Sequence, residues 1–257
     1  MPKLALLGLA GALLSAAGCG SAVAAPIQAL VWKGHTWKVT NGPMAGISPG
    51  SGGNVFVDAR GYLHLKIAHK GSSWTCAELY TADRLGFGTY QWQIEGAIDA
   101  MDPTTVLGLF PYGPAAGVGR DGENEIDVEF ARWNGTIRAN ADFTYYPATG
   151  HGKKDIGGSP IASDTDSFSF RLSGKTFTTA RTVWGQRSVT STLMLGLRPL
   201  GSTSRVLHSH TYAPADFRTR IPQVAVPLGI NFWSFQVHPA RDQEVIIRDF
   251  RHVPEKA

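Results

Sequence analysis

The segment 125–129 reads Glu-Ile-Asp-Val-Glu, with an acid at every second position and apolar residues between. Successive side chains of a β-strand point to opposite faces, so a strand here places Glu125, Asp127 and Glu129 on one face. Ile126, Val128 and the residue after the segment, a phenylalanine, then share the other face. Three acids on one face repel one another and raise the pKa of at least one of them. The pattern therefore predicts a strand with one chemically reactive face and one core face.

The spacing of the acids fits a retaining glycosidase if the sheet is curved. Such enzymes use one ionised carboxylate as nucleophile and one protonated carboxyl as general acid, about 5 to 5.5 Å apart. On a flat strand the Cα atoms of Glu125 and Glu129 would lie about 13 Å apart. Side chains that lean together shorten this gap, and concave curvature of the sheet closes the rest. The motif thus implies a bent sheet with the acids in its hollow. The alternative is an edge strand that exposes charge against aggregation.

Residues 122–130, Gly-Glu-Asn-Glu-Ile-Asp-Val-Glu-Phe, resemble the catalytic signature of glycoside hydrolase family 16. The resemblance implies an all-β fold: a β-jelly roll sandwich of two curved antiparallel sheets, similar to concanavalin A, with a substrate cleft across the concave sheet. It also implies that Glu125 is the nucleophile, that Asp127 tunes and orients it, and that Glu129 is the acid/base. The acids have the regular spacing, without the extra residue of a β-bulge. This spacing resembles lichenases, xyloglucan-active enzymes and chitin-glucan transglycosylases more than laminarinase-type β-1,3-glucanases.

Further segments resemble the same family in the expected order, between about residues 27 and 254, although the resemblance is weak between 148 and 222. They are residues 76–80 with 86–92, 106–110, 222–233, and 245–250, which resembles the final strand of the convex sheet. In the segment 222–233 the resemblance implies that Asn231 and Trp233 face the sugar. These two residues are two positions apart and therefore share one face of a strand, as that role requires.

A cleft that binds a polysaccharide needs aromatic planes and hydrogen-bonding groups. For Trp233 we favour sugar contact over a core position, and for Trp133 the two interpretations are equally open. Asn140 and Arg132 are further candidates for substrate binding. Trp92 alternates with core-like residues, so we interpret it as structural.

The remaining composition predicts one all-β domain over residues 26–257. Apolar residues make up 43% of the chain, and thirty Gly with fifteen Pro supply the turns that short strands require. Apolar and polar residues alternate in segments 63–67, 90–94 and 168–172, which predicts half-buried strands there. We find no helical apolar stripe of convincing length, no repeat and no second domain.

Residues 1–25 have the three parts of a secretory signal peptide: Lys3, an apolar stretch, and small residues before the expected cleavage site. The apolar stretch is too short to span a bilayer comfortably. We expect a secreted or periplasmic protein, and the alternative is a lipoprotein anchored through Cys19. Either outcome leaves Cys76 as the one cysteine of the mature chain, so no intrachain disulfide is possible. We interpret Cys76 as a small buried residue.

Other chemistries find little support. A net charge of +4 is too small to indicate a nucleic acid as partner. His208 and His210 share a strand face but lack a matched acid in the sequence, which is weak evidence for a metal. No cofactor is required and no catalytic metal is predicted, although Asp102, Asp121 and Glu123 could hold a structural Ca²⁺. The expected partner is a polysaccharide of the β-glucan class, bound by a monomer without a transmembrane span.

The sequence thus predicts an exported, endo-acting retaining glycoside hydrolase that cleaves a β-glucan-type polysaccharide by double displacement. Two alternatives stay open. A transglycosylase could use the same three acids, and a non-catalytic glycan-binding protein could use the same jelly roll.

Overall fold

The structure, a computed structural model, describes residues 28–113, 122–154 and 160–256. The expected signal peptide, the possible lipidation site Cys19 and the possible calcium ligand Asp121 lie outside the described residues.

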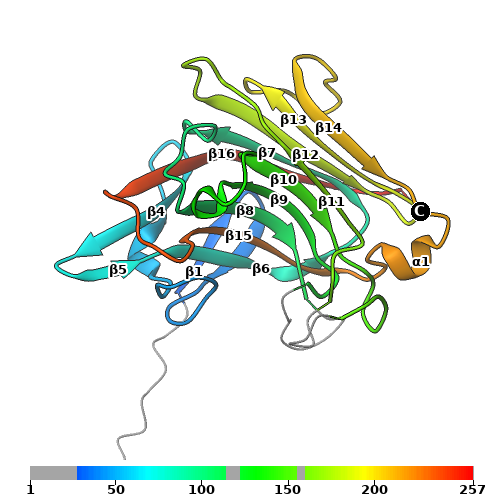
Figure 1. The fold of residues 1–257 in the computed structure, drawn as a ribbon, viewed down its shortest axis with the longest axis horizontal. Helices are drawn as coiled ribbons and strands as arrows, with labels where there is room; N and C mark the ends of the chain where they lie inside the picture. The colour runs from blue at the N-terminus through cyan, green and yellow to red at the C-terminus, as the bar shows by residue number, and fades with distance from the viewer. Residues whose placement is uncertain (1–27, 114–121, 155–159, 257) are drawn as a thin grey trace, which may run out of the picture.

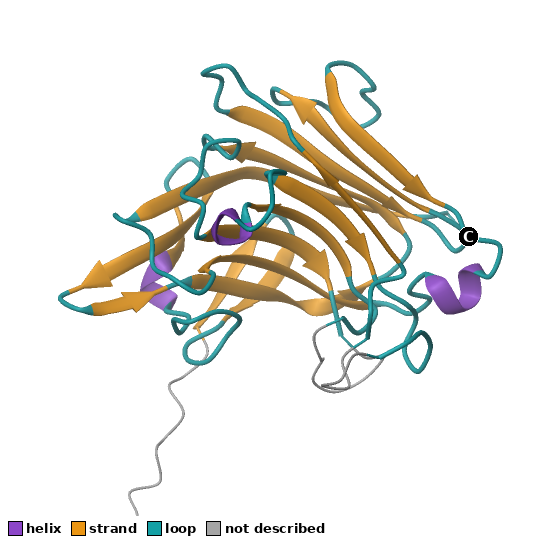
Figure 2. Ribbon diagram, viewed as in Figure 1, coloured by secondary structure: helices purple, strands orange, loops and turns teal. Residues whose placement is uncertain are grey.

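Nearly all regular structure in the described residues is β-strand, with one short α-helix and two single-turn 3₁₀ helices (Figure 2). The elements are β1 Gln28–Trp32, β2 His35–Val39, η1 Gly52–Asn54, β3 Val55–Val57, β4 Leu63–Lys70, β5 Ser73–Thr75, β6 Ala77–Leu85, β7 Gly88–Glu95, β8 Thr105–Pro111, β9 Ile126–Ala131, η2 Trp133–Gly135, β10 Ala141–Tyr145, β11 Asp164–Phe168, β12 Phe177–Trp184, β13 Val189–Leu195, β14 Val206–Tyr212, α1 Phe217–Arg220, β15 Val226–Ser234 and β16 Gln243–Pro254. In the described part of the chain no helix is both long enough and apolar enough to cross a bilayer.

Two curved antiparallel sheets lie face to face (Figure 1). The first sheet has the order β1-β2-β6-β15-β8-β9-β10-β11, and the second has the order β14-β13-β12-β7-β16-β4-β3, with β5 paired to β4. Neighbouring strands in each sheet are often far apart in sequence, as β15 between β6 and β8 illustrates. The predicted all-β jelly roll is therefore confirmed, including the place of the segment 245–250 in β16 of the second sheet.

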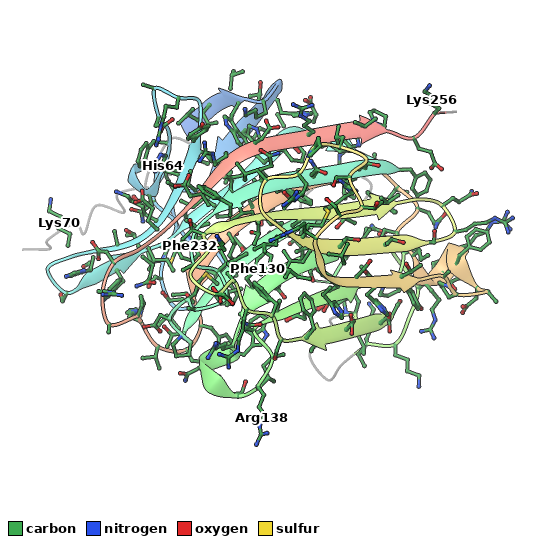
Figure 3. All side chains as sticks on the ribbon, turned by 90° about the horizontal axis from the view of Figure 1, so that it is seen from above. His64, Lys70, Phe130, Arg138, Phe232 and Lys256 are labelled. Carbon is green, nitrogen blue, oxygen red and sulfur yellow. The ribbon has the colours of Figure 1, made fainter. Side chains whose placement is uncertain are left out.

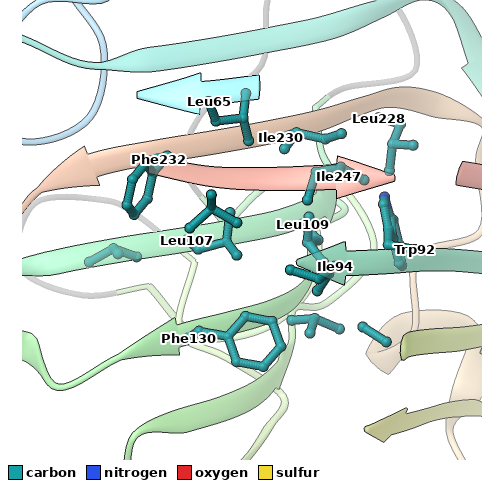
Figure 4. Close-up of a cluster of buried hydrophobic side chains, with 14 of the residues drawn as sticks. Leu65, Trp92, Ile94, Leu107, Leu109, Phe130, Leu228, Ile230, Phe232 and Ile247 are labelled. Atoms are coloured by element: carbon teal, nitrogen blue, oxygen red, sulfur yellow. The ribbon is translucent and has the colours of Figure 1, made fainter. Parts of the chain in front are cut away.

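The core lies between the sheets and is built from alternate residues of their strands. Figure 4 shows its centre, where Leu107, Ile230 and Phe232 of the first sheet meet Ile94 and Ile247 of the second. These side chains are at most 1% exposed. Because apolar burial of this kind is the main driving force of folding, the core fixes the position of every strand that passes through it.

The alternation in segments 63–67 and 90–94 is confirmed by β4 and β7, and the apolar side chains of these two segments are fully buried. This burial includes Trp92, which is structural as expected. The third predicted strand is partly wrong, since β11 ends at Phe168. Phe170 and Leu172 are buried, but they follow the strand rather than continue it. The cause is Asn140, as the next subsection describes.

Candidate active site

Strand β9 carries Asp127 and Glu129 in the interior of the first sheet, between β8 and β10, and Glu125 directly precedes the strand. Its pairing with both neighbours has no register shift, in agreement with the regular spacing of the acids. Val128 and Phe130 point into the core and are at most 1% exposed. The acids occupy the opposite face, and the interior position of β9 rules out the edge-strand alternative.

An open cleft of about 980 Å³ lies on this face of the first sheet, and Glu125, Asp127 and Glu129 all line it. The other lining residues come mainly from β2, β6, β8 and β15 and from the loop after β2: Lys38, Pro43, Met44, Ala45, Gly46, Glu78, Tyr80, Thr81, Ala82, Arg84, Phe110, Tyr112, Gly113, Trp133, Tyr146, Pro227, Asn231 and Trp233. The expected hollow with the acids inside it is therefore present. Glu125 and Asp127 are only 7% and 6% exposed, so each presents little more than its carboxylate to the cleft.

The turn before β9 fixes the Glu125 side chain. The backbone N–H of Gly122 donates a hydrogen bond to a Glu125 carboxylate oxygen. Gly122 has φ +74°, and a Cβ there would lie 2.9 Å from the ring of Tyr146, so both conformation and space require glycine. Asn124, fully buried with φ +51°, donates from Nδ2 to the carbonyl of Gly113 at 2.8 Å. These contacts hold the carboxylate in one orientation before any ligand binds.

The strand register places Glu129 in a row of cleft residues from distant parts of the chain. Glu78 lies opposite Asn231, Asn231 opposite Gly108, and Gly108 opposite Glu129. Gly108 donates its N–H to Asn231 Oδ1 at 3.1 Å, and a Cβ at this position would lie 2.5 Å from the same oxygen. Only glycine therefore leaves room for the Asn231 amide beside Glu129.

Asp142 continues this row on β10, directly opposite Glu129, and the sequence analysis did not select it. It accepts hydrogen bonds from Trp133 Nε1 at 3.3 Å and from the Thr144 hydroxyl at 3.2 Å. Burial raises the pKa of Asp142 above its ordinary value, although these two bonds oppose the shift. The alternation of Asp142 and Thr144 was the available signal, but a single acid in an apolar strand did not stand out.

Glu78 is a second cleft acid that the sequence analysis quoted within a motif but did not propose as a site residue. It is 5% exposed and accepts a hydrogen bond from the Thr40 hydroxyl at 2.8 Å. Burial raises its pKa, and the hydrogen bonds from Thr40 and Tyr80 partly offset the shift. Its position two residues before Tyr80, on the same strand face, could have revealed it.

Two aromatic groups border the cleft. On one side Trp133 and Trp233 meet edge to face with ring centroids 6.1 Å apart, and Phe235 packs against Trp133 at 5.2 Å. A Cβ on Gly46 would lie 2.4 Å from the Trp233 ring, and this close cover leaves Trp233 8% exposed. Trp233 and Trp133 both line the cleft, so each has a surface that a sugar could contact.

The second aromatic group consists of Tyr80, Phe110 and Tyr112, whose ring centroids are about 6 Å apart. Glycine at position 229 leaves room for two of these rings, because a Cβ there would lie 2.6 Å from Phe110 and 2.8 Å from Tyr80.

Two sequence-predicted binding residues do not line the cleft. Asn140 is buried, and its amide donates to the carbonyls of Asp99 and Phe170, both at 3.0 Å, while its Oδ1 accepts from the Phe170 N–H. The Asn140 amide thus occupies the backbone N–H and carbonyl of Phe170, which a neighbouring strand would otherwise bind. This explains why β11 ends before Phe170. Arg132 is exposed and donates to the carbonyl of Asp99 at 3.2 Å. The expectation of sugar contact at Asn140 and Arg132 is not supported by these positions.

Three of the possible metal ligands, Asp102, His208 and His210, make contacts within the fold. His208 and His210 of β14 each contact a β11 carboxylate, Asp166 at 2.5 Å and Asp164 at 2.6 Å, so the acids absent from the sequence pattern come from another strand. Asp102 accepts bonds from the Thr104 N–H and hydroxyl at 3.0 and 2.7 Å. Among the described residues no group of three or more His, Cys, Asp or Glu could hold a metal ion.

Cys76 is fully buried with its sulfur near the Ser234 hydroxyl, and burial raises the pKa of the thiol. The expected role as a small buried residue is confirmed.

The fold was compared with known proteins. No protein-family model and no curated protein matches the chain. Among solved structures, the β-glucanase of Bacillus licheniformis is similar with TM-score 0.59 and 19% identity, over 85% of this chain and 92% of that one. A prokaryotic β-1,3-1,4-glucanase (lichenase) from a mouse hindgut metagenome has TM-score 0.58 and 19% identity, over 85% and 93%. A family 16 endo-glucanase from Bacteroides ovatus, in complex with the ligand G4G3G-2F-DNP, has TM-score 0.60 and 10% identity, over 84% and 94%.

These likenesses establish the fold. The chain has the β-jelly roll found in enzymes of glycoside hydrolase family 16, and the resemblance read from its sequence is confirmed at this level.

Proposed function

We propose that this protein is an exported, endo-acting retaining glycoside hydrolase that cleaves a polysaccharide of the β-glucan class. The observation that carries the proposal is that Asp127 and Glu129 on one face of an interior strand, and Glu125 directly before that strand, line the same large cleft. An open cleft, rather than a closed pocket, suits cleavage within a polymer. The fold shared with two β-glucanases and an endo-glucanase supports the substrate class.

The proposed reaction is a double displacement. Glu129, protonated, gives its proton to the glycosidic oxygen while the Glu125 carboxylate forms a bond to the anomeric carbon, and the bond between this carbon and the leaving oxygen breaks. Glu129, now ionised, takes a proton from a water molecule that attacks the anomeric carbon. The bond to Glu125 breaks, and the released sugar keeps its original anomeric configuration.

The surroundings of the acids support these roles. The Gly122 N–H holds Glu125 in one orientation, which lowers the entropic cost of attack. Asp127 lies between the other two acids in sequence and shares their face, so its charge favours a proton on a neighbouring carboxyl. We assign Asp127 to positioning Glu125 and to keeping Glu129 protonated.

The direct test is release of reducing sugar by the chain from residue 26 onward from mixed-linked glucan, laminarin, xyloglucan, agarose and carrageenan. Glu125→Ala and Glu129→Ala are measured in parallel, with circular dichroism and thermal unfolding as controls for folding. We expect release from at least one polymer and a loss of several orders of magnitude in each folded variant. Near-normal turnover in either variant would overturn the assignment of that residue.

Proton NMR of the first product decides between retention and inversion. We expect the anomer of the substrate linkage to form first and to equilibrate later. An inverted first product would contradict Glu125 as nucleophile while leaving a hydrolase in place.

Two outcomes would move the proposal to the alternatives. Longer oligosaccharides on addition of an acceptor would indicate a transglycosylase with the same acids. Binding of a polymer without any turnover or transfer would indicate a glycan-binding protein on this fold.

A further inference from the structure

A fourth carboxyl group lies directly across the strands from Glu129. Asp142 of β10 is the register partner of Glu129 of β9. Two residues further along the same ladder, the Ala131 N–H donates to the carbonyl of Asn140 at 3.2 Å, and hydrogen-bonded pairs recur at every second residue of an antiparallel ladder. Glu129 and Asp142 are therefore a hydrogen-bonded pair, with Cα atoms about 5.5 Å apart and side chains on the same face.

This carboxyl stands closer to Glu129 than the acid on the same strand does. Asp127 is two residues from Glu129, so their Cα atoms lie about 6.5 to 7 Å apart. Phe130, the residue after Glu129, belongs to the opposite face: it is fully buried and stands near the middle of the molecule in Figure 3. Of the two acids, Asp142 on the neighbouring strand is therefore the nearer partner of Glu129.

Asp142 is held in place away from the cleft surface. It is only 4% exposed and does not line the cleft. Its carboxylate accepts hydrogen bonds from Trp133 Nε1 at 3.3 Å and from the Thr144 hydroxyl at 3.2 Å, and burial raises its pKa. Asp142 can therefore act on the reaction only through a neighbouring side chain.

The direct neighbours of this carboxyl pair carry no charge. Gly108 of β8 lies opposite Glu129 on one side, and Ser167 of β11 lies opposite Asp142 on the other. Trp133 faces Asp142 from η2. The acids on the same face, Asp127 and Glu125, stand further along β9 and before it, and their charges also favour a proton on the pair.

Other titratable side chains of the cleft stand further away. The charged residues of β2 and β6 that line it lie three or more strand spacings from β9, about 14 Å or more, and are Lys38, Glu78 and Arg84. Tyr112 and Tyr146 follow the last residues of β8 and β10, at the end where β9 begins. The charge state of Glu129 is therefore most sensitive to Asp142.

We propose that Asp142 is a positioning residue for this reaction, which shares one proton with Glu129 and holds the Trp133 ring at the cleft. The inference rests on the proposed function for the roles of Glu125 and Glu129. It deepens that function by assigning control of the proton on Glu129 to a residue that does not touch the substrate.

One shared proton suits both halves of the double displacement. Before the reaction the pair carries one negative charge, and the Glu125 carboxylate carries another. When Glu129 gives its proton to the glycosidic oxygen, the pair carries two charges while Glu125 becomes a neutral ester, so the total over these three groups is unchanged. The two adjacent charges then make Glu129 a stronger base toward the attacking water. Asp142 thus helps Glu129 to hold a proton in the first step and to take one in the second.

The bond to Trp133 links this pair to the cleft wall. Trp133 has φ +47° and Asn134 has φ +56°, a left-handed backbone that a bulky side chain rarely adopts. Such a turn persists where its surroundings fix it, and here the bond to Asp142 and the packing of Trp233 and Phe235 do so. Because Trp133 lines the cleft, loss of the Asp142 carboxyl would free this ring as well as remove a charge.

The first measurement follows the Glu129 carboxyl in the ligand-free protein and does not depend on turnover. Carbon-13 NMR of labelled Asp and Glu carboxyls is recorded from about pH 3 to pH 9, and the Glu129 signal is assigned by its loss in Glu129→Gln. In the unaltered protein we expect this signal to show two titration steps, separated by at least about 1 pH unit, because two adjacent carboxyls titrate as a pair. A single step would overturn the shared proton without any change at Asp142.

Asp142→Asn then removes one titrating carboxyl and keeps an oxygen that accepts from Trp133 and Thr144. We expect the upper step of Glu129 to fall by about 1 pH unit, because a charge about 5 Å away is lost. The alkaline limb of kcat/KM should fall by the same amount on any polymer that is cleaved. Activity well above that limb should thus be about tenfold lower, with little change at lower pH.

Asp142→Ala separates the second role of this side chain. Alanine accepts no bond from Trp133, so we expect the same shift of the alkaline limb and, in addition, a KM about 3- to 10-fold higher than in Asp142→Asn. The matched control is Asp166→Asn on β11, the strand next to β10. Asp166 contacts His208 of the second sheet at 2.5 Å, so its replacement should leave both the Glu129 titration and the alkaline limb unchanged.

An unchanged Glu129 titration in Asp142→Asn, or an equal shift in Asp166→Asn, would overturn the shared proton. Equal KM values in the Asn and Ala variants of Asp142 would reject its role in holding Trp133. Failure of the proposed function gives a different result: a Glu129 titration that depends on Asp142, without turnover of any polymer, keeps the carboxyl pair and rejects the hydrolase. Turnover that Glu125→Ala abolishes, with no shift in Asp142→Asn, keeps the hydrolase and rejects the inference.

Discussion

The outer faces of the two sheets both carry polar side chains. In the described part of the chain, only on the second sheet do backbone carbonyls of a neighbouring loop accept hydrogen bonds from several of these side chains. On the second sheet, Gln91 and Gln93 donate to the carbonyl of Arg198, and Arg181 donates to those of Pro199 and Ser202. On the first sheet, Glu125 and Asp127 are buried and Glu129 is half-buried, yet all three line an open cleft. Polar groups that the chain satisfies itself contribute stability, whereas polar groups held in place beside a cleft are available to a ligand.

The largest effect should follow from removal of the transferable proton at Glu129. Glu129→Gln keeps the size of the side chain and should lower kcat by about 10²- to 10⁴-fold with little change in Tm. Glu123→Gln is the matched control, because Glu123 is half-exposed and does not line the cleft. Equal loss in both variants would show that charge near β9, not proton transfer, controls the rate.

A second prediction tests whether the geometry of the cleft floor is functional. Gly108→Ala pushes a Cβ toward Asn231 Oδ1, so we expect about 10- to 100-fold lower kcat/KM and roughly 1–3 kcal/mol lower stability. Gly185→Ala is the control, since its Cβ would meet nothing closer than 3.6 Å. Normal turnover in a folded Gly108→Ala protein would remove Asn231 from the site.

The opposite result is expected on the second sheet. Arg181→Met removes hydrogen bonds to Gln91 and to the two loop carbonyls, and should lower the free energy of unfolding by about 1–2 kcal/mol in urea titrations. Turnover at a temperature where the variant is folded should be unchanged. A loss of turnover without a loss of stability would break the distinction between the two faces.

The smallest effect concerns Glu78, whose pKa is raised by burial. The folded protein then holds this proton more tightly than the unfolded chain, so stability falls as pH rises from the unfolded pKa of about 4.3 through the folded pKa. Glu78→Gln keeps an acceptor for Thr40 and removes this loss. The variant should match the original protein at pH 3 and gain relative stability toward pH 7, as urea unfolding at both pH values would show.

The alternation of apolar and polar residues was sufficient to predict a strand where no distant side chain took the place of a neighbouring strand. The alternation of Leu63, Leu65 and Ile67 and of the segment 90–94 predicted β4 and β7, and the acids of 125–129 predicted the two faces of β9. The same pattern failed at 168–172 because Asn140, thirty residues before Phe170, occupies the backbone groups that a strand neighbour would use.

Residue type alone did not identify the rest of the site. Asn140 and Arg132 have suitable chemistry, but their side chains serve the loops around Asp99. Glu78 and Asp142 do not belong to an alternating run of acids and were not proposed as site residues. They join Glu129 only through the register of β6, β15, β8, β9 and β10. No local pattern contains that register.

By itself, the sequence determined the all-β class and the two faces of β9, because side-chain alternation is a property of each strand alone. The tertiary structure decided which strands lie beside β9, how the sheet curves around the acids, and which side chains share the cleft. Those features depend on packing between segments more than a hundred residues apart, such as Gly108 and Asn231, and on the space that each partner leaves for the other.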